Sequence, residues 1–304
     1  EFDIVVTDNE VPSINCTSDL SQTADESACS ATIDIAVPVV SDNCAISSLT
    51  NDFNGTTDAS DVYPIGVTTV VWTSTDIHGN VTNCSFDVTV TDDEMPIINC
   101  AADLTELLDD NCEFVIPNYI AQATATDNCD NDLDYTQSPI AGTVISGSGT
   151  VQAITITATD DAGNSNNCSF NVILDDVIAP EINCPDDQTE YVDASCEIIL
   201  PDYTSLAFAT DNCSTPVITQ EPLAGTVFNL GNYEVSLTAT DQDGNTTTCT
   251  FNVEVLDNTS PIIACPEDII VELTDNCDFT LEDYRSMVQA TDNCSDVTIA
   301  QLPV

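Results

Sequence analysis

Short stretches in which apolar and polar side chains alternate recur along the whole chain. Three of them, residues 72–75, 154–159 and 235–240, lead directly into a Thr-Asp-x-x-Gly-Asn segment. Beyond the first of these segments, residues 86–90 resume the same alternation. An alternating run on each side of a Gly-Asn turn is typical of a β-hairpin. The pattern therefore predicts pairs of antiparallel strands.

These hairpins belong to a longer unit, which is marked by four cysteines in a fixed order. The first cysteines of successive units, at positions 16, 100, 184 and 265, are 84, 84 and 81 residues apart. Each unit also carries a proline four residues before its first cysteine and an Asp-Asn-Cys segment at its third. A period this long, built of short strand-like pieces, indicates a row of small domains.

The repeat divides the chain into three complete units and two partial ones. Residues 1–8 match the segment that follows Cys84, so we expect them to be the last strand of a preceding repeat. The other expected ranges are 9–92 for repeat 1, 93–176 for repeat 2, 177–257 for repeat 3 and 258–304 for a partial repeat 4. Six or seven short strands in this length favour a small antiparallel β-sandwich. Because aromatic residues make up only 6% of the chain, each core is thin and depends on cross-links.

Charge and cysteine content narrow the partners and the compartment. The chain has fifty-three Asp and Glu residues and a single Lys or Arg, Arg285, so its formal net charge is -52. Such a charge repels nucleic acids and anionic membranes and favours cations as partners. Hydrophobic residues reach 42% in alternating runs, which distinguishes this chain from disordered acidic segments. No apolar run in this sequence approaches the length of about 18 residues that spans a membrane. Fifteen cysteines in a regular array predict disulfides and an extracellular location.

The order of these motifs resembles the hyalin repeat family. The matching elements are Pro-Ile-Ile-x-Cys, Thr-Asp-Asn-Cys, an aromatic-x-[Ile/Leu]-Gly element at residues 63–66 and 228–231, Thr-Ala-Thr-Asp-x-x-Gly-Asn, and Cys-[Ser/Thr]-Phe-x-Val. The resemblance covers the whole chain, and only repeat 2 lacks the aromatic element, at residues 145–149. It implies an all-β fold of tandem immunoglobulin-like β-sandwich repeats in an extended rod. It also implies a long extracellular or cell-surface protein, which we expect to be bacterial.

The resemblance also implies a disulfide between the first and fourth cysteines of each repeat, namely Cys16–Cys84, Cys100–Cys168 and Cys184–Cys249. The remaining paired cysteines, also expected to be oxidised, are Cys29, Cys44, Cys112, Cys129, Cys196, Cys213, Cys277 and Cys294. One hypothesis joins the second cysteine of a repeat to the third of the next, as in Cys29–Cys129, Cys112–Cys213 and Cys196–Cys294. The alternative pairs the first cysteine with the second and the third with the fourth. The spacing of the cysteines does not distinguish between these two pairing schemes.

Carboxylates offer the candidate chemistry. In such a sandwich, three segments meet at one pole of each repeat: the entering linker, the Asp-Asn-Cys loop and the Thr-Asp-x-x-Gly-Asn loop. Their oxygens suit Ca²⁺, which takes six to eight hard ligands. The candidate ligands are Asp8, Glu10, Asp42, Asp76, Asn80, Asp92, Asp93, Glu94, Asp127, Asp160, Asp161, Asn164, Asp175, Asp176, Asp211, Asp241, Asp243, Asn245, Asp257 and Asp292. The alternative is that these acids only cap turns or are solvated.

Catalysis is not expected. The single histidine, His78, occupies a loop position where the other repeats have Ala162 and Asp243, and no Cys-x-x-Cys zinc spacing occurs. We therefore expect a structural repeat region of an extracellular filament or adhesin stalk, with neighbouring repeats or copies of the same protein as partners. The alternative is a module that binds surface glycans or proteins through exposed loops, with Tyr63 and Tyr135 as the candidates for stacking on sugars.

Overall fold

The computed structural model describes residues 2–302, which form β-strands and three single-turn 3-10 helices. Residues 1, 303 and 304, which belong to the expected ranges 1–8 and 258–304, lie outside the description. The chain forms two compact units. Unit 1 comprises residues 1–106, 114–145 and 150–173, and unit 2 comprises residues 107–113, 146–149 and 174–304. Within residues 2–302, no helix has the length and apolar character needed to cross a membrane.

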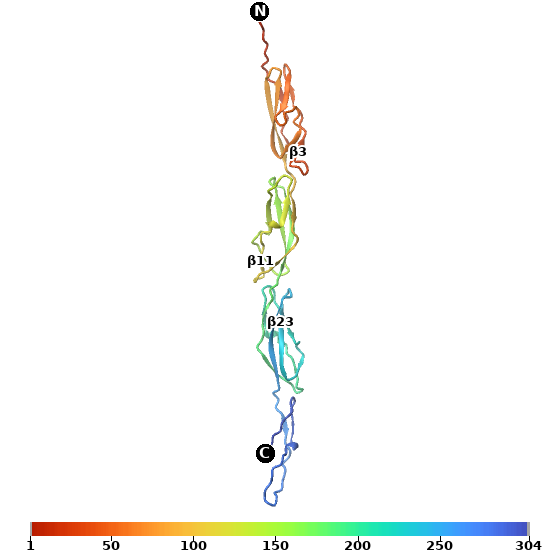
Figure 1. The fold of residues 1–304 in the computed structure, drawn as a ribbon, viewed down its shortest axis with the longest axis vertical. Helices are drawn as coiled ribbons and strands as arrows, with labels where there is room; N and C mark the ends of the chain where they lie inside the picture. The colour runs from red at the N-terminus through yellow and green to blue at the C-terminus, as the bar shows by residue number, and fades with distance from the viewer. Residues whose placement is uncertain (1, 303–304) are drawn as a thin grey trace. The chain divides into compact units, whose positions relative to one another are not determined.

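Residues 13–91 of unit 1 form a two-layered β-fold (Figure 1). Its strands are β1 (Ser13–Asn15), β2 (Leu20–Thr23), β3 (Ser30–Ile33), β4 (Val39–Ser41), β5 (Ile46–Asn51), β6 (Asp61–Pro64), β7 (Gly66–Asp76) and β8 (Val81–Thr91). One layer is a four-stranded sheet with the order β2-β8-β7-β5, and the pairs β1-β4 and β3-β6 supply the other. The predicted hairpin is β7–β8, in which Trp72 lies opposite Cys84. Its turn contains Gly79 at a φ of 88°, where residues with a Cβ are strained.

The core of this fold lies between the β7–β8 hairpin and the β3–β6 pair. Its most buried side chains alternate along these strands: Ala31, Ile33, Tyr63, Val70, Trp72, Phe86, Val88 and Val90. Alternation places every second side chain of a strand on one face, so the apolar positions of both layers meet. The sequence pattern therefore predicts the buried face correctly.

Residues 97–175 repeat the plan. Their strands are β9 (Ile97–Cys100), β10 (Leu104–Leu107), β11 (Glu113–Val115), β12 (Ala123–Thr126), β13 (Asp134–Ser138), β14 (Val144–Ser146), β15 (Val151–Thr159) and β16 (Ser165–Asp175), with the 3-10 helix η1 (Ile120–Gln122). The sheet order is β10-β16-β15-β13, and β9 pairs with β12 and β11 with β14. In the β15–β16 hairpin, Ile156 lies opposite Cys168. Ile156 therefore occupies the position that Trp72 holds in the first hairpin.

Unit 2 contains a third copy of this fold. Its strands are β17 (Glu181–Asn183), β18 (Gln188–Tyr191), β19 (Ile198–Ile199), β20 (Phe208–Thr210), β21 (Val217–Glu221), β22 (Val227–Phe228), β23 (Gly231–Thr240) and β24 (Thr246–Leu256), with η2 (Thr204–Leu206). The sheet order is β18-β24-β23-β21. Residues 258–302 add only β25 (Ile262–Ala264), η3 (Arg285–Met287) and β26 (Gln289–Thr291). Most apolar side chains of this last segment are exposed, since the described part of it has no hairpin to cover them.

Two local features differ from a simple antiparallel sandwich. Residues 2–8, predicted to be the last strand of a preceding repeat, are not assigned to a strand in this chain, and Phe2, Ile4 and Val6 are at least 77% exposed. A strand requires a neighbour for its backbone hydrogen bonds, and this segment pairs with none of the described strands. The sheets are also not wholly antiparallel, since β2 runs parallel to β8 and β18 runs parallel to β24.

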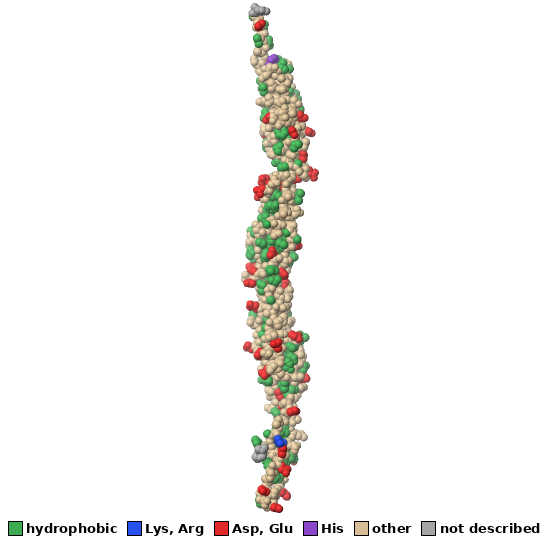
Figure 2. Space-filling model, viewed as in Figure 1, with side chains coloured by type: hydrophobic (Ala, Val, Ile, Leu, Met, Phe, Trp, Pro, Cys, Tyr) green, Lys and Arg blue, Asp and Glu red, His purple; other side chains and the backbone are tan. Residues whose placement is uncertain are grey.

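Acidic side chains are dispersed over the surface. Figure 2 shows them scattered on the face in view among hydrophobic and uncharged atoms, and the blue atoms belong to Arg285, the chain's single Lys or Arg. Arg285 is exposed and its guanidinium bonds Asp283 at 2.7 Å. The other acids therefore have no basic side chain with which to pair, apart from the 3.4 Å contact of Asp8 with His78.

Candidate metal centre

The Thr-Asp-x-x-Gly-Asn turn between β23 and β24 is closed by its own aspartate and asparagine. The backbone N–H of Asp241 donates to the carbonyl of Asn245 at 3.1 Å, and the backbone N–H of Asn245 donates to Asp241 Oδ1 at 2.8 Å. The side-chain amide of Asn245 donates to Asp241 Oδ2, also at 2.8 Å. These bonds fix the orientation of the Asp241 carboxylate.

The same asparagine holds the linker that enters the repeat. Asn245 Nδ2 donates to the carbonyl of Asp176 at 2.9 Å, and Asp176 Oδ1 accepts the backbone N–H of Ile178 at 3.1 Å. The equivalent amide bonds of the other copies, both 3.3 Å long, join Asn80 to Asp8 and Asn164 to Asp92. The three asparagines predicted as cation ligands therefore place the acids by donating hydrogen bonds to them.

The Asp-Asn-Cys segment supplies the third acid. Asp211 Oδ2 accepts the backbone N–H groups of Cys213 and Ser214, both at 3.0 Å. This tight turn leaves Asp211 Oδ1 with no hydrogen-bond partner among residues 2–302. Asp42 and Asp127 are held in the same way, and each has one unpartnered oxygen among the described residues.

Asp176, Asp211 and Asp241 come together in one acidic cluster. We call it the third cluster because Asp211 and Asp241 belong to repeat 3. One carboxylate oxygen from each lies within 4.8 Å of the others. Asp176 is only 2% exposed, and its Oδ2 has no hydrogen-bond partner in the described chain. A buried polar atom normally has a hydrogen-bond partner, because leaving it without one costs about 1–3 kcal/mol. The cost is higher for a charged group. The arrangement therefore has the donor set of a cation site.

Local hydrogen bonds favour the ionised form of Asp241. Burial acts to raise the pKa of Asp241, but the hydrogen bonds from Asn245 and from the backbone N–H groups of Gly244 and Asp243 outweigh it, so the pKa is lowered. Two unit charges about 4 Å apart repel by about 4 kcal/mol at the effective dielectric near a protein surface. A cation between such groups would relieve this repulsion.

The first cluster, which is Asp8, Asp42 and Asp76, has the same form. Asp76 is 2% exposed, and hydrogen bonds from Asn80 and the turn N–H groups lower its pKa although burial opposes them. Asp8 Oδ2 and Asp42 Oδ2 are unpartnered in the described chain, apart from a 3.4 Å contact between Asp8 and His78 Nδ1. The pKa of Asp8 is lowered, chiefly because the Cys44 thiol donates to it.

The second cluster differs in its third member. Asp92 and Asp127 lie close together, and Cys129 joins them where Asp160 was expected. Asp160 is buried, and both of its oxygens accept hydrogen bonds from Asn164, at 2.8 and 2.9 Å. The prediction that three carboxylates meet at each pole therefore holds for the first and third clusters, and only two carboxylates meet in the second.

Several other predicted ligands lie outside the clusters. Glu10 accepts the Asn43 amide at 3.1 Å, Glu94 accepts the backbone N–H of Ser27, and Asp243 accepts the Ser148 hydroxyl at 2.7 Å. Asp93 and Asp161 are exposed, and Asp175 ends β16 beside the cluster. The pKa of Asp292 is lowered, chiefly because the backbone N–H of Cys294 donates to it, with a smaller contribution from Asp257, and no third acid joins these two among the described residues.

The asparagines of the Asp-Asn-Cys segments are not among the predicted ligands. The Asp-Asn-Cys asparagines Asn212 and Asn293 each have a buried Oδ1 without a partner among residues 2–302. Their Nδ2 atoms are occupied: Asn212 donates to the Asp109 carbonyl at 3.1 Å and to Asp176 Oδ1 at 3.3 Å. The amide oxygen is thereby left available to a cation. The occurrence of Asn before the third cysteine in all four repeats is the signal that identifies it.

Residues 2–302 contain five disulfides. Three join the first and fourth cysteines of a repeat with Cα–Cα distances of 5.6–5.8 Å, namely Cys16–Cys84, Cys100–Cys168 and Cys184–Cys249. Two join the second cysteine of one repeat to the third of the next at 4.9 and 5.1 Å, namely Cys112–Cys213 and Cys196–Cys294. These are pairings of the first hypothesis, and the alternative of first with second and third with fourth does not occur among the described residues.

Four cysteines expected to be oxidised are thiols in the structure: Cys29, Cys44, Cys129 and Cys277. Cys44 lies next to Asp8, whose hydrogen bond raises the pKa of the thiol, and no second cysteine bonds it in the described chain. Cys277 is exposed in the turn after residue 274, and Cys265 is also free and exposed. Cys29 and Cys129 face each other without a bond.

Comparison with known proteins places these features in a family context. The HYR domain matches residues 7–90 and 175–255, which together are more than half of the chain. Hyalin of Strongylocentrotus purpuratus is 26% identical over 282 residues, which cover 88% of this chain and 23% of that protein. Hyalin of Lytechinus variegatus is 30% identical over 253 residues, which cover 80% of this chain and 46% of that protein. The chain therefore spans less than half of either relative.

The expectation of a bacterial source is not supported, since these two hyalins come from sea urchins. Among solved structures, mouse cadherin-23 EC22-24 is 14% identical with a TM-score of 0.35, and the match covers 82% of this chain and all of that one.

Proposed function

Since this chain belongs to the HYR domain family, we propose that it is a structural repeat region of an extracellular filament or adhesin stalk. The chain is an extracellular, adhesion-type repeat protein, in keeping with its hyalin relatives and its five disulfides. Its role in the proposal is mechanical: consecutive repeats are joined by disulfides and by calcium at the acidic clusters. No catalytic step is part of it.

The observation that carries the calcium assignment is the buried, unpartnered Oδ2 of Asp176 in the third cluster. Two oxygens bound to one Ca²⁺ at roughly 2.4 Å cannot lie more than about 4.8 Å apart. The oxygens of Asp176, Asp211 and Asp241 meet this limit, and the unpartnered amide oxygen of the neighbouring Asn212 would be a fourth donor. All four are hard oxygen donors, which favours Ca²⁺ over Zn²⁺.

A pocket next to the third cluster offers a route for the ion. It has a volume of about 280 Å³ and is lined on its polar side by Asp211, Asn212, Asp110 and Glu181. Acidic walls concentrate cations at the entrance. Waters in this pocket would complete the six to eight ligands that Ca²⁺ takes.

The cross-repeat disulfides support the mechanical role. Cys112–Cys213 ties the turn at residues 109–113 to the Asp-Asn-Cys segment that supplies Asp211. Cys196–Cys294 makes the equivalent connection further along the chain. At the third cluster, the disulfide and the proposed cation site lie side by side, so this junction would have one link that fails under reduction and another that fails under chelation.

The test is calcium titration of the full chain by isothermal calorimetry, together with calorimetric melting in calcium and in EDTA. We expect up to three bound ions, one for each cluster, and a higher melting temperature with calcium. The variant Asp176→Asn should lose about one ion or weaken it roughly tenfold or more, because it removes one charged ligand. Without calcium the same variant should melt at or above the temperature of the unmodified chain, since it removes repulsion.

The matched control is Asp175→Asn, which makes the same charge change one residue away from the cluster. It should leave the stoichiometry and the calcium-dependent melting unchanged. Absence of calcium uptake by the unmodified chain, with identical melting in EDTA, would reject the calcium assignment. The adhesive alternative loses one of its candidates, since Tyr63 is fully buried and cannot stack on a sugar. Specific binding of the full chain on a glycan array would restore that alternative.

A further inference from the structure

The second cysteine of a repeat and the third cysteine of the next form a disulfide in two cases, but in a third case the two equivalent cysteines are free thiols. The bonds Cys112–Cys213 and Cys196–Cys294 each join the second cysteine of a repeat to the third of the next. Cys29 and Cys129 hold the same places in the order of the chain and lie in unit 1. Both are thiols in the structure.

The contacts around this pair match those at the bonded turns. The Asn128 amide donates to the Ala28 carbonyl at 3.2 Å and to Cys129 Sγ at 3.3 Å. The corresponding asparagine of the bonded junction, Asn212, donates to the Asp109 carbonyl at 3.1 Å and to Cys213 Sγ at 3.3 Å. The loop of the second repeat thus meets the turn of the first in the same manner. The two thiols are hydrogen-bond neighbours, and Cys129 Sγ also lies 3.8 Å from the Ala28 carbonyl.

The turn of the first repeat differs by one residue. Cys112 follows Asp109 by three positions and donates its backbone N–H to the Asp109 carbonyl, with a φ of 60°. In the first repeat Ala28 makes this bond, to Asp25, and Cys29 comes one residue later. One residue moves the backbone by at most about 3.8 Å. The Cys29 side chain is exposed and lies within hydrogen-bond reach of Cys129, and it is this separation that a bond would have to close.

We infer that Cys29 and Cys129 form a third disulfide between repeats, so that this junction is cross-linked like the other two. The reaction is a thiol–disulfide exchange with a low-molecular-weight disulfide such as oxidised glutathione, or with an oxidoreductase in its disulfide form. A Cys29 thiolate attacks the reagent, forms a mixed disulfide and releases one thiolate. The Cys129 thiolate then attacks the Cys29 sulfur and releases the second. The protein loses two electrons and two protons, and the reagent becomes two thiols.

The environments of the two sulfurs indicate which one attacks the reagent first. Cys29 is exposed, so a reagent can reach it, whereas Cys129 is half-buried against the turn. Cys129 Sγ accepts the Asn128 amide at 3.3 Å and lies 3.8 Å from the Ala28 carbonyl. A sulfur packed against these groups is less accessible to a reagent in solvent than an exposed one. Cys29 is therefore the attacking cysteine, and Cys129 closes the bond.

The experiment uses the full oxidised chain, denatured in the presence of EDTA without reductant. Thiols are counted with a chromogenic disulfide reagent and then mapped by alkylation, peptic digestion at low pH and mass spectrometry. We expect three alkylated cysteines, Cys44, Cys265 and Cys277, and one cross-linked fragment that contains Cys29 and Cys129. Five titratable thiols, with Cys29 and Cys129 both alkylated, would overturn the inference. EDTA ensures that a metal held by the two sulfurs cannot conceal them.

Two variants test the order of attack. After exposure of the reduced protein to oxidised glutathione under native conditions, Cys129→Ser should accumulate a glutathione adduct on Cys29, because the second thiolate is missing. Cys29→Ser should leave Cys129 mostly as a free thiol. Equal adduct formation at both positions would contradict the assigned order, and failure of the unmodified chain to form the bond under these conditions would overturn the proposal itself. The Cys112–Cys213 bond in each sample shows that the protein has folded.

Discussion

Aspartate serves three different purposes in this chain, and the local hydrogen bonds decide which. Asp241 accepts bonds from its own turn and is held in a fixed orientation. Asp103 reaches across to a strand backbone, where it accepts the N–H of Asn171 at 2.7 Å and its side-chain amide at 3.2 Å. Asp176 keeps one oxygen without a partner among the described residues. Only the last arrangement points to a cation, although all three residues look alike in composition.

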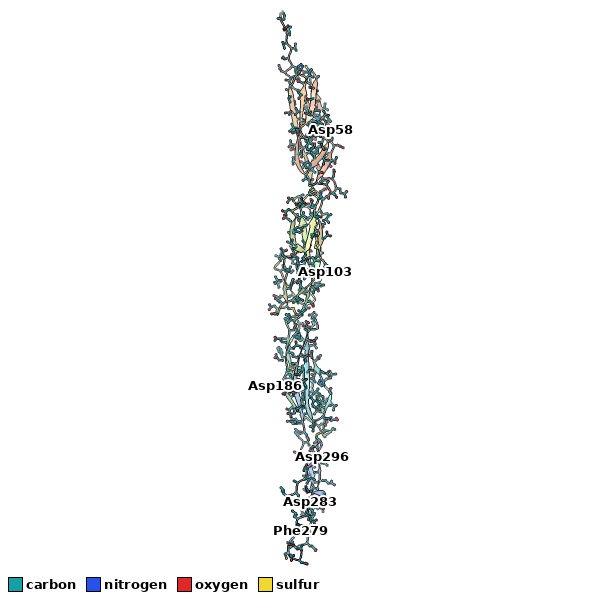
Figure 3. The ribbon with its side chains drawn as sticks, in the orientation of Figure 1. Asp58, Asp103, Asp186, Phe279, Asp283 and Asp296 are labelled. Atoms are coloured by element: carbon teal, nitrogen blue, oxygen red, sulfur yellow. A yellow bond between two sulfur atoms is a disulfide. The ribbon has the colours of Figure 1, made fainter. Side chains whose placement is uncertain are left out.

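Asp103, labelled in Figure 3, offers a test of pH dependence away from the acidic clusters. The backbone and side-chain hydrogen bonds from Asn171 lower its pKa. Its contribution to stability is therefore fully present above the unfolded-state value of about 3.9 and is lost as the pH falls through the lower folded-state value. The amide resonance of Asn171 should titrate with an apparent pKa below about 3.9. The measurement is a pH series of amide spectra of the folded chain.

The control for this prediction is the equivalent pair in the third repeat. Asp103→Asn should abolish the titration of the Asn171 amide, while the Asn252 amide, which donates to Asp187 at 2.8 Å, should give the same spectra as in the unmodified chain. The stability difference between the variant and the unmodified chain should shrink as the pH falls below about 3.9, since both side chains are then neutral. A midpoint at or above the ordinary value would show that the hydrogen bonds do not favour the ionised form.

The sequence predicts the members of the clusters better than their arrangement. Asp176, Asp211 and Asp241 follow from motifs that recur in every complete repeat, because each motif is a local turn with its own hydrogen bonds. The exclusion of Asp160 could not be predicted, since its motif is identical to that of Asp241. The difference arises from where the linker and loops of repeat 2 lie, which is a tertiary property.

At the scale of the strands, the hairpins were predictable and the parallel pairs were not. Each hairpin is a local structure whose alternation and Gly-Asn turn appear within about 25 residues of sequence. The pairing of Leu20 with Val88 joins strands that are far apart in the chain, and the short strand β2 has no alternation to reveal it. Its position also depends on Asp19, which accepts the backbone N–H of Asp87 at 2.9 Å.

Trp72 tests how the first hairpin is stabilised. It is fully buried in the core on β7, and its indole N–H has no partner among the described residues. Trp72→Ala should cost about 3–5 kcal/mol, the usual range for deleting a large core side chain. Trp72→Leu should cost less than half of that, because Leu237 fills the same position opposite Cys249 in the third repeat and because the unsatisfied donor is removed.

Hydrogen–deuterium exchange of the full chain measures this effect locally. Peptides from residues 66–91 should exchange faster in the Ala variant and only slightly faster in the Leu variant. Peptides from residues 231–256 serve as the internal control and should be unchanged in both. Equal acceleration in the Ala and Leu variants would show that the indole volume matters less than its shape. A change in the control peptides would show that the repeats do not unfold independently.

At the scale of the whole molecule, charge and cross-links act together. A formal charge of -52 with a single Lys or Arg means that ion pairs do not relieve the repulsion between carboxylates, so the proposed cations would relieve it and the disulfides hold the chain together against it. The sequence predicts this balance without reference to the fold, since it depends only on composition. It does not predict which cysteines pair, because that depends on contacts between turns that are about 100 residues apart, such as Cys112 and Cys213.

The scarcity of basic residues has a consequence for proteolysis outside the cell. Trypsin-like enzymes cut after Lys or Arg, and Arg285 is the single such residue in 304. In the reduced, alkylated and denatured chain, trypsin should therefore make one cut at most, whereas a Glu-specific protease should produce many peptides. The folded, oxidised chain should resist the Glu-specific enzyme over residues 13–256, because its strands are held in sheets and closed by disulfides. Gel electrophoresis with mass spectrometry of the fragments measures both outcomes.

Rapid cleavage of the native chain within residues 13–256 would contradict the prediction and would mean that the repeats open often enough to expose their backbone. Such opening would remove the basis for a long-lived mechanical role, since a structural repeat must survive among secreted proteases for as long as the surface it serves.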